Sequence, residues 1–108
     1  MTFSIKQYET TAITINDLRT GLEADFILIE NDIDPFIDSI KYALDDEADE
    51  NGEYGSSFFM SGIGESITIY KLAPSNGDTI IRIESNTEEA SITPDTAQHI
   101  IADLKDIK

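Results

Sequence analysis

The sequence contains no cysteine, no tryptophan and no valine, and it has a single histidine and three prolines. Without cysteine the chain can form no disulfide framework and no thiolate metal site, and it has no thiol nucleophile. No segment approaches the roughly 20 apolar residues that span a bilayer, and the N-terminus lacks the basic start and apolar run of a secretory signal. We therefore expect a cytoplasmic protein that neither crosses nor binds a membrane.

Basic residues are also scarce. The 108 residues include 7 Lys+Arg against 22 Asp+Glu, which gives a formal net charge of -15. With 40% hydrophobic residues the chain has enough apolar material for one core, so we expect a single folded domain over residues 1–108. A charge of this size repels nucleic acid and anionic membranes and attracts basic proteins, so it predicts a basic protein partner and no direct binding of nucleic acid.

The acidity is concentrated in one segment. Residues 30–53 contain ten acids and one base, Lys41, which is a net charge of -9 in 24 residues. The other 84 residues have a net charge of -6, an ordinary value for a soluble domain. The excess of isoleucine, 18 residues against no valine, is not the bias expected of a halophile, so salt adaptation is a weak explanation of this pattern.

In the N-terminal third, apolar residues alternate with polar ones over residues 3–15, which predicts one or two short strands. Asn16 or Asp17 is placed to cap a short helical turn that ends near Gly21. The compact apolar run 24–30 predicts a buried strand, with a helix that continues from Asp17 as the alternative.

The clearest helix start is Asp34-Pro35, with Asp34 as N-cap and Pro35 at the first helical position. This helix is predicted to run to about Ala48, with an apolar face made of Phe36, Ile37, Ile40, Ala43 and Leu44. Residues 45–55 then form an acidic helix end and loop. Acids at the C-terminal end of a helix oppose its dipole, at a cost of up to about 1 kcal/mol each, which the fold alone does not explain.

In the C-terminal half, residues 57–61 predict a strand, and residues 65–72 and 79–85 an antiparallel hairpin joined through Asn76-Gly77. A last helix begins at Thr93-Pro94 and has an apolar stripe. The predicted fold class is α+β: one small domain with an antiparallel sheet of three to five strands and two main helices packed on it.

Two patterns within the acidic segment suggest other functions. In the frame that begins at Glu47, acids alternate and Gly52 is sixth, as in a calcium loop, but position twelve is Phe58 and not a bidentate glutamate. Asp38-Ser39-Ile40 resembles the Asp-Ser-Leu attachment site of acyl carrier proteins, which are all-helical and shorter. Because a hairpin follows the motif, we expect Ser39 to be an ordinary serine on the helix surface.

The sequence contains no catalytic signature. His99, the only histidine, has no serine or carboxylate at a spacing that indicates a triad. We therefore predict a protein that is not an enzyme and uses no cofactor and no metal.

The acidic surface is the strongest functional signal. Carboxylates three or four residues apart on a helix lie about 5 to 6 Å from one another, a density similar to that of DNA phosphates, which occur once per about 1.7 Å of duplex axis. Tyr42, Tyr54 and Phe58 lie near them in sequence as candidate aromatic anchors. The predicted partner-binding residues are Asp34, Asp38, Asp45, Asp46, Glu47, Asp49, Glu50, Glu53, Tyr42 and Tyr54.

In size, charge and lack of catalytic motifs the chain resembles the DNA-mimic inhibitors, among them the anti-restriction and anti-CRISPR proteins of phages. The resemblance is one of class and has no alignable motif. It implies an inhibitor that acts in the cytoplasm of a prokaryotic host on a basic nucleic-acid-binding protein, such as a CRISPR effector, a restriction enzyme or a nuclease. Two alternatives stay open: an immunity protein that neutralises a cationic nuclease toxin, and a module that binds a divalent cation or another ligand.

Overall fold

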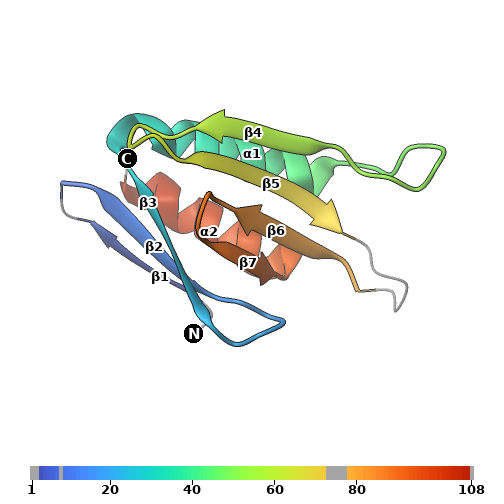
Figure 1. Ribbon diagram of the computed structural model, residues 1–108, viewed down its shortest axis with the longest axis horizontal. Helices are drawn as coiled ribbons and strands as arrows, with labels where there is room; N and C mark the ends of the chain where they lie inside the picture. The colour runs from blue at the N-terminus through green and yellow to red at the C-terminus, as the bar shows by residue number, and fades with distance from the viewer. Residues whose placement is uncertain (1–2, 8, 73–77, 108) are drawn as a thin grey trace.

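A computed structural model describes residues 3–7, 9–72 and 78–107. It confirms the α+β class, with antiparallel strands and two main helices, and divides the strands between two sheets (Figure 1). In chain order the elements are β1 (Phe3–Gln7), β2 (Thr11–Asn16), β3 (Glu23–Leu28), a 3-10 turn η1 (Glu30–Asp32), α1 (Ile33–Asp45), β4 (Ser56–Met60), β5 (Ser66–Leu72), β6 (Ile80–Glu84), β7 (Glu89–Ile92) and α2 (Pro94–Ile107).

The first sheet has the order β1-β2-β3. The predicted alternation holds, since Ile13 and Ile15 are buried while their neighbours in β2 are more exposed. Between β2 and β3 the predicted helical turn is a single turn, closed by a 2.8 Å bond from the Gly21 amide to the Asp17 carbonyl. Gly21 has a φ of 73°, which only glycine adopts at low cost, and this conformation turns the chain into β3.

The second sheet has the order β4-β5-β6-β7. The β5/β6 hairpin is as predicted and pairs Ile69 with Ile83, whereas its Asn76-Gly77 turn lies outside the described residues. β7, which the sequence analysis did not predict, is only four residues long. Its buried residues are Ala90, Ser91 and Ile92, a run without the clear alternation of a half-exposed strand.

Both helices lie behind the second sheet in Figure 1 and cover one of its faces. β4 shows which face this is, because the Ser57 hydroxyl is 3.0 Å from that of Ser39 on α1, and Phe59 packs edge-to-face against Phe36. The inner side of the first sheet joins the same core, so one continuous apolar cluster connects both sheets and both helices. The Cα trace is elongated, 43 × 26 × 25 Å.

The predicted ends of α1 are wrong at both termini. The helix begins at Ile33 with Asp32 as N-cap, so Asp34 lies in its first turn and not at the cap. Pro35 is tolerated there because the first turn has no intrahelical partner for its N–H groups. The helix ends at Asp45 and not near Ala48, because Asp46 adopts an extended conformation with ψ of 142°.

The second helix begins where the sequence predicts. The Thr93 hydroxyl accepts a 3.1 Å hydrogen bond from the Thr96 amide, which is the expected N-cap contact. Ala97, Ile100 and Leu104 face the core. Within the described residues, neither helix has the length and apolar content needed to cross a bilayer.

Candidate functional site

The predicted helical acids lie on one exposed stripe of α1. Asp34, Asp38 and Asp45 are exposed, and their spacing of four and seven residues places them along the same side of the helix. Lys41 lies in the same stripe, between Asp38 and Asp45. The row of negative charge on α1 is therefore interrupted once.

A second lysine, Lys105 on α2, adds positive charge next to Lys41. The interaction between these two amines lowers the pKa of Lys105 below its ordinary value. The helix pair consequently presents a small positive spot among its exposed aspartates. Half of the ten acids of residues 30–53 lie beyond the end of α1.

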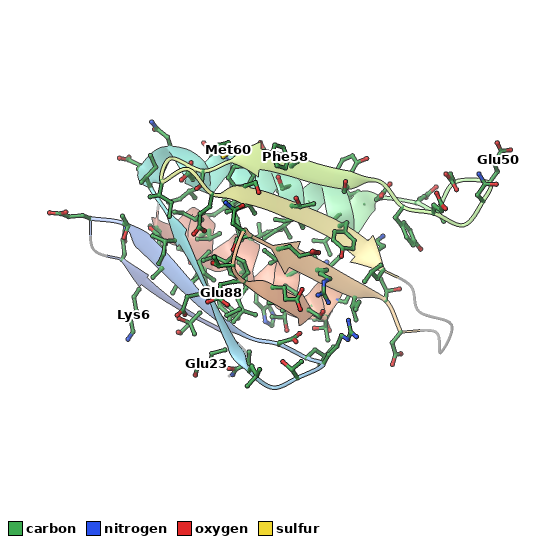
Figure 2. All side chains as sticks on the ribbon, in the orientation of Figure 1. Lys6, Glu23, Glu50, Phe58, Met60 and Glu88 are labelled. Atoms are coloured by element: carbon green, nitrogen blue, oxygen red, sulfur yellow. The ribbon has the colours of Figure 1, made fainter. Side chains whose placement is uncertain are left out.

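That charge is carried by an ordered loop, residues 46–55, which we call the acidic arm. The arm projects from the end of α1 and returns to β4, and Glu50 lies at its tip (Figure 2). Its two halves are joined by a 2.8 Å bond from the Asp49 amide to the Glu53 carbonyl, and a 2.9 Å bond from the Gly52 amide to the Asp49 carbonyl closes the tip. Gly52 has a φ of 80°, the left-handed conformation that this tight turn requires.

Two of the predicted partner-binding acids hold the arm together instead of pointing outward. The Asp49 carboxylate accepts hydrogen bonds from the amides of Asn51 and Glu53, at 2.8 and 2.9 Å. The Asp46 carboxylate accepts a 2.8 Å bond from the Gly55 amide at the base of the arm. Both carboxylates therefore fix the backbone, although Asp49 is exposed, and the other exposed acids of the arm are Glu47, Glu50 and Glu53.

The base of the arm is fixed by a lysine from the inner side of β5. The Lys71 ammonium donates hydrogen bonds to the carbonyls of Leu44 and Asp46, at 3.0 and 2.6 Å, and lies 5.4 Å from the centre of the Tyr54 ring. These carbonyls end α1, so the lysine offsets the unfavourable acids at this helix terminus. The helix itself has no basic residue in its last turn.

The predicted aromatic anchors lie in two places. Tyr42 is exposed on α1, and its hydroxyl approaches Gly55 so closely that a Cβ there would lie 2.7 Å from it. Tyr42 and Tyr54 therefore flank the base of the arm. Phe58 lies on the outer face of β4, opposite to Ser57 and Phe59, and so on the side of the sheet away from α1.

Two further residues of the acidic segment are buried. Asp32, one of the ten acids of that segment, accepts hydrogen bonds from the amides of Ile29 and Gly62, all at 3.0 Å, and joins the start of α1 to the β4–β5 turn. Ser39 is 5% exposed and faces β4, so the expectation of a surface serine is wrong. Neither side chain can contribute to an exposed acidic surface.

A cation site is not evident in the part of the chain that the structure describes. No group of three or more His, Cys, Asp or Glu side chains there is arranged to hold a metal ion. In the calcium-like frame, Asp49 uses its carboxylate to bind arm amides.

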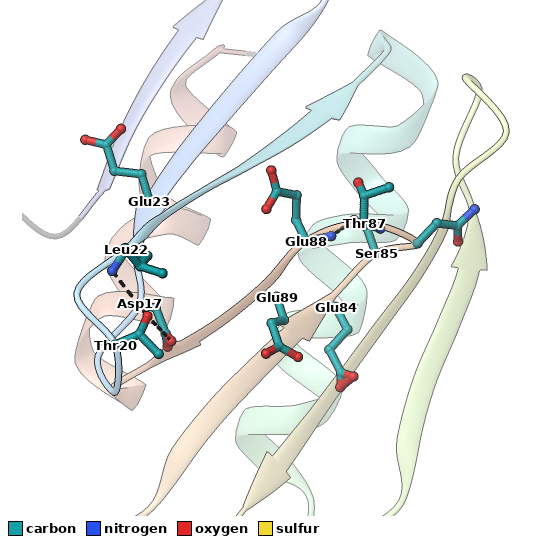
Figure 3. Close-up of a pocket in the computed structure, with 10 residues that line it drawn as sticks. Asp17, Thr20, Leu22, Glu23, Glu84, Ser85, Thr87, Glu88 and Glu89 are labelled. Carbon is teal, nitrogen blue, oxygen red and sulfur yellow. Dashed lines mark hydrogen bonds between the residues drawn. The ribbon is translucent and has the colours of Figure 1, made fainter.

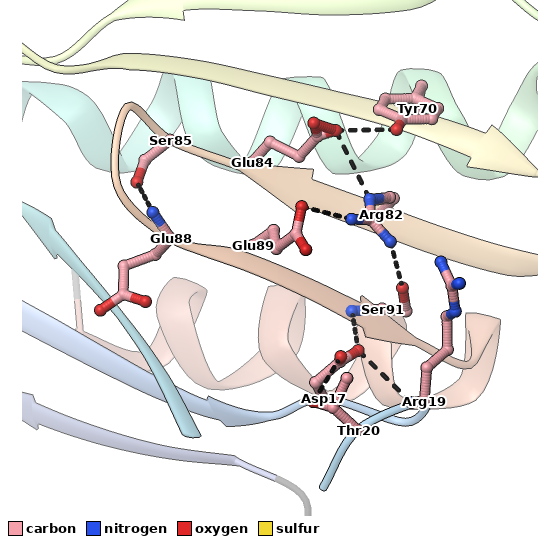
Figure 4. Close-up of polar contacts among 10 residues, drawn as sticks. All are labelled: Asp17, Arg19, Thr20, Tyr70, Arg82, Glu84, Ser85, Glu88, Glu89 and Ser91. Atoms are coloured by element: carbon pink, nitrogen blue, oxygen red, sulfur yellow. Dashed lines mark hydrogen bonds and ion pairs between the residues drawn. The ribbon is translucent and has the colours of Figure 1, made fainter. Parts of the chain in front are cut away.

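A second polar region lies on the outer face of the second sheet, where the sequence analysis made no prediction. Arg82 forms ion pairs with Glu84, at 3.4 Å, and with Glu89, and its guanidinium donates to the Ser91 hydroxyl (Figure 4). Burial opposes the charge of Arg82, but the contact with Glu89 outweighs it and raises the pKa of the guanidinium. Burial and the hydrogen bond from its hydroxyl to Glu84 raise the pKa of Tyr70.

These residues lie on three consecutive strands, and the register of the sheet places them side by side, which the sequence analysis did not specify. Next to them, the turn after β2 and the β6–β7 turn enclose a hollow of about 370 Å³ (Figure 3). Its acidic lining residues are Asp17, Glu23, Glu84, Glu88 and Glu89.

Comparisons with known proteins give no relative for this chain: no protein-family model, no curated protein and no solved structure matches it. Its function has to be inferred from its own residues and geometry.

Proposed function

We propose that this protein is a non-enzymatic inhibitor that binds the basic groove of a nucleic-acid-binding protein, with the acidic arm in the place of the phosphate backbone. The observation that carries the proposal is the construction of the arm. Asp46 and Asp49 bind backbone amides, and this holds Glu47, Glu50 and Glu53 outward on an ordered projection.

Order in the free protein matters for affinity. A flexible acidic loop loses conformational entropy when it binds, at about 0.5 to 1.5 kcal/mol for each immobilised side chain in addition to the backbone cost. The hydrogen bonds of Asp49 and Asp46 and the contacts of Lys71 fix the arm before it meets a partner.

The electrostatics of the segment favour a strongly basic target. Lys41 is the single base between Glu30 and Glu53, so the arm and the α1 stripe repel one another in the free protein. Lysine and arginine side chains that line a nucleic-acid groove would relieve this repulsion on binding. Tyr42 and Tyr54 at the base of the arm supply apolar area beside the charges.

The proposal is tested by affinity capture from a prokaryotic lysate with the intact protein and two variants of equal net charge. The arm variant carries Glu47→Lys, Glu50→Lys and Glu53→Lys, which leaves Asp46 and Asp49 in place. The control variant carries Glu9→Lys, Asp103→Lys and Asp106→Lys, three exposed acids outside the arm.

The expected result is that the intact protein and the control variant retain the same basic nucleic-acid-binding protein at low salt and release it at high salt. The arm variant should lose at least about tenfold in affinity, because it places like charges opposite the groove. Equal retention by both variants would show that the arm is not the binding surface.

A further inference from the structure

One face of the second sheet is not covered by either helix. We call eight outward side chains of β4, β5 and β6 the open face: Ser56, Phe58, Met60, Ser66, Thr68, Tyr70, Arg82 and Glu84. Leu72 and Ile80 lie on the same side, at the far ends of β5 and β6. Figure 1 shows both helices on the opposite side of this sheet. The turn after β2 covers only the β7 end, through a 2.8 Å bond from the Leu18 amide to the Ser91 carbonyl.

The β4 end of the open face is apolar. Phe58 and Met60 are 61% and 59% exposed and stand side by side along β4 (Figure 2). β4 is an edge strand that pairs only with β5 in its sheet. Two large apolar side chains on an edge strand are an association hazard that proteins usually blunt with charge, so their presence here indicates a contact surface.

The opposite end of the open face is acidic. Arg82 fixes the carboxylates of Glu84 and Glu89 (Figure 4). Beyond them, Glu23 and Glu88 line the 370 Å³ hollow from two different elements (Figure 3). This hollow has five acidic lining residues, and Arg82 beside it balances only part of their charge.

The two ends are separated by a short, defined span. Phe58 pairs with Thr68, and Thr68 pairs with Glu84, so two strand spacings, or about 10 Å, separate the apolar and acidic ends. A second hollow of about 340 Å³, lined by Tyr54, Thr68, Tyr70 and Glu84 among others, lies between them and shares Glu84 with the first. Three or four residues of extended chain cover this distance, at about 3.3 Å per residue.

We propose that the open face docks an extended segment of a partner protein in which apolar residues are followed, three or four residues later, by arginine or lysine. The apolar residues would contact Phe58 and Met60, and the cation would enter the acidic hollow. Charge complementarity selects this occupant over a second copy of the chain, since two molecules of net charge -15 repel each other. The inference goes beyond the proposed function, because the open face lies on the second sheet and shares with the arm only Tyr54 and Gly55 at its base, through the second hollow.

The test uses two synthetic peptides of equal charge and NMR amide shifts of the full chain. The probe is acetyl-Leu-Leu-Ser-Arg-Ser-Arg-amide, and its control, acetyl-Ser-Ser-Ser-Arg-Ser-Arg-amide, lacks the apolar end. We expect the probe to shift amides of β4, β5 and residues 84–89 in a saturable way, in the intact protein and in the arm variant alike. The control peptide should bind the open face at least about tenfold more weakly, a difference that a single well-buried side chain can account for.

The matched protein variant is Phe58→Ser with Met60→Ser, which should retain the fold because both side chains are exposed. We expect it to lose the preference for the probe over the control peptide, and Glu88→Gln to weaken the binding of both peptides at residues 84–89. Shifts confined to the acidic arm, or equal binding of the two peptides, would overturn the proposal. Sedimentation that shows a dimer of the intact protein, abolished in the serine variant, would overturn it in favour of a second copy.

Discussion

At the scale of single residues, Asp17 shows how one carboxylate joins the two sheets. It is 8% exposed and accepts hydrogen bonds from the Ser91 amide and the Thr20 hydroxyl, both at 2.8 Å, and a longer one from the Arg19 amide (Figure 4). Burial opposes its charge, but these hydrogen bonds outweigh burial, so the pKa of Asp17 lies below its ordinary value.

We predict that Asp17→Ala lowers the free energy of unfolding by about 1 to 3 kcal/mol, because it leaves the buried Ser91 amide without its acceptor. Asp17→Asn should cost less, since its amide oxygen can still accept from Ser91. Asp103→Ala, at an exposed position of α2, is the control and should change the stability by less than about 0.5 kcal/mol. Urea unfolding measures all three, and equal stability of Asp17→Ala and the control would contradict the role given to Asp17.

The same carboxylate predicts a pH dependence. Because the pKa of Asp17 is lower in the folded than in the unfolded protein, the ionised group stabilises the fold above the ordinary value of 3.8. This contribution is lost as the pH falls through that value toward the lower folded pKa. The stability difference between the intact protein and Asp17→Asn should therefore be constant from neutral pH to about pH 5 and shrink below about pH 4. A difference that stays unchanged down to pH 3 would show that the charge does not contribute.

The sequence predicted one of the two roles of Asp17, the cap of a turn, but not its bond to the other sheet. Asp17 was predicted as a candidate cap of the turn that follows β2, and it is. Its bond to Ser91 joins residues 74 positions apart, and neither the alternation nor the charge pattern contains that information. The hydrogen bonds of Asp46 and Asp49 to the backbone of the arm could not be predicted either, because the sequence does not distinguish these two acids from the others in the segment.

At the scale of elements, α1 and the arm are joined through Lys71. Lys71 lies on the same inward side of β5 as Ile67 and Ile69. Its ammonium donates to the last carbonyls of α1, a role that a basic residue in the last turn of the helix often has. Acids at the C-terminal end of α1 interact unfavourably with the helix dipole, and the sequence alone does not explain why they are there. Lys71 on β5 offsets part of this cost.

We predict that Lys71→Met lowers the free energy of unfolding by about 1 to 3 kcal/mol, because two carbonyls lose a charged donor. Amide hydrogen exchange in residues 46–55 should also speed up, since the base of the arm is released. Lys6→Met, on an exposed position of β1, serves as the control. Unchanged exchange in the arm of Lys71→Met would show that the lysine does not fix it.

Most elements could be predicted because their signals are local. Alternating apolar residues predicted β1, β2, β5 and β6, and Thr93-Pro94 predicted the start of α2. The start of α1 was misplaced because Asp34-Pro35 is a stronger local signal than Asp32, whose side chain does not cap α1 but accepts hydrogen bonds from the amides of Ile29 and Gly62. The strand β7 was missed because it is short and buried against the turn after β2.

At the scale of the whole molecule, the net charge of -15 acts on a body only 25 to 43 Å across. Self-repulsion of this kind destabilises the compact state and is screened by salt, with a Debye length of about 10 Å at 0.1 M. The acids are unevenly distributed, so the repulsion is greatest around α1 and the arm.

We predict that the Tm rises by several degrees between low salt and about 0.5 M sodium chloride, where about 1 kcal/mol corresponds to roughly 4 to 8 °C for a domain of this size. The arm variant should have a higher Tm than the intact protein at low salt, and the difference should narrow as salt is added. Differential scanning calorimetry measures both effects. A Tm that is independent of salt would mean that the acidity has no cost to the fold.

The central claim is that the arm takes the place of nucleic acid, and displacement tests it most directly. The protein captured by the intact chain is loaded with a labelled DNA duplex, and the intact chain, the arm variant and the control variant are each titrated into the complex. The account predicts that the intact chain and the control variant displace the duplex completely, and that the arm variant needs at least about tenfold more. A complex that holds the intact chain and the duplex together would contradict it.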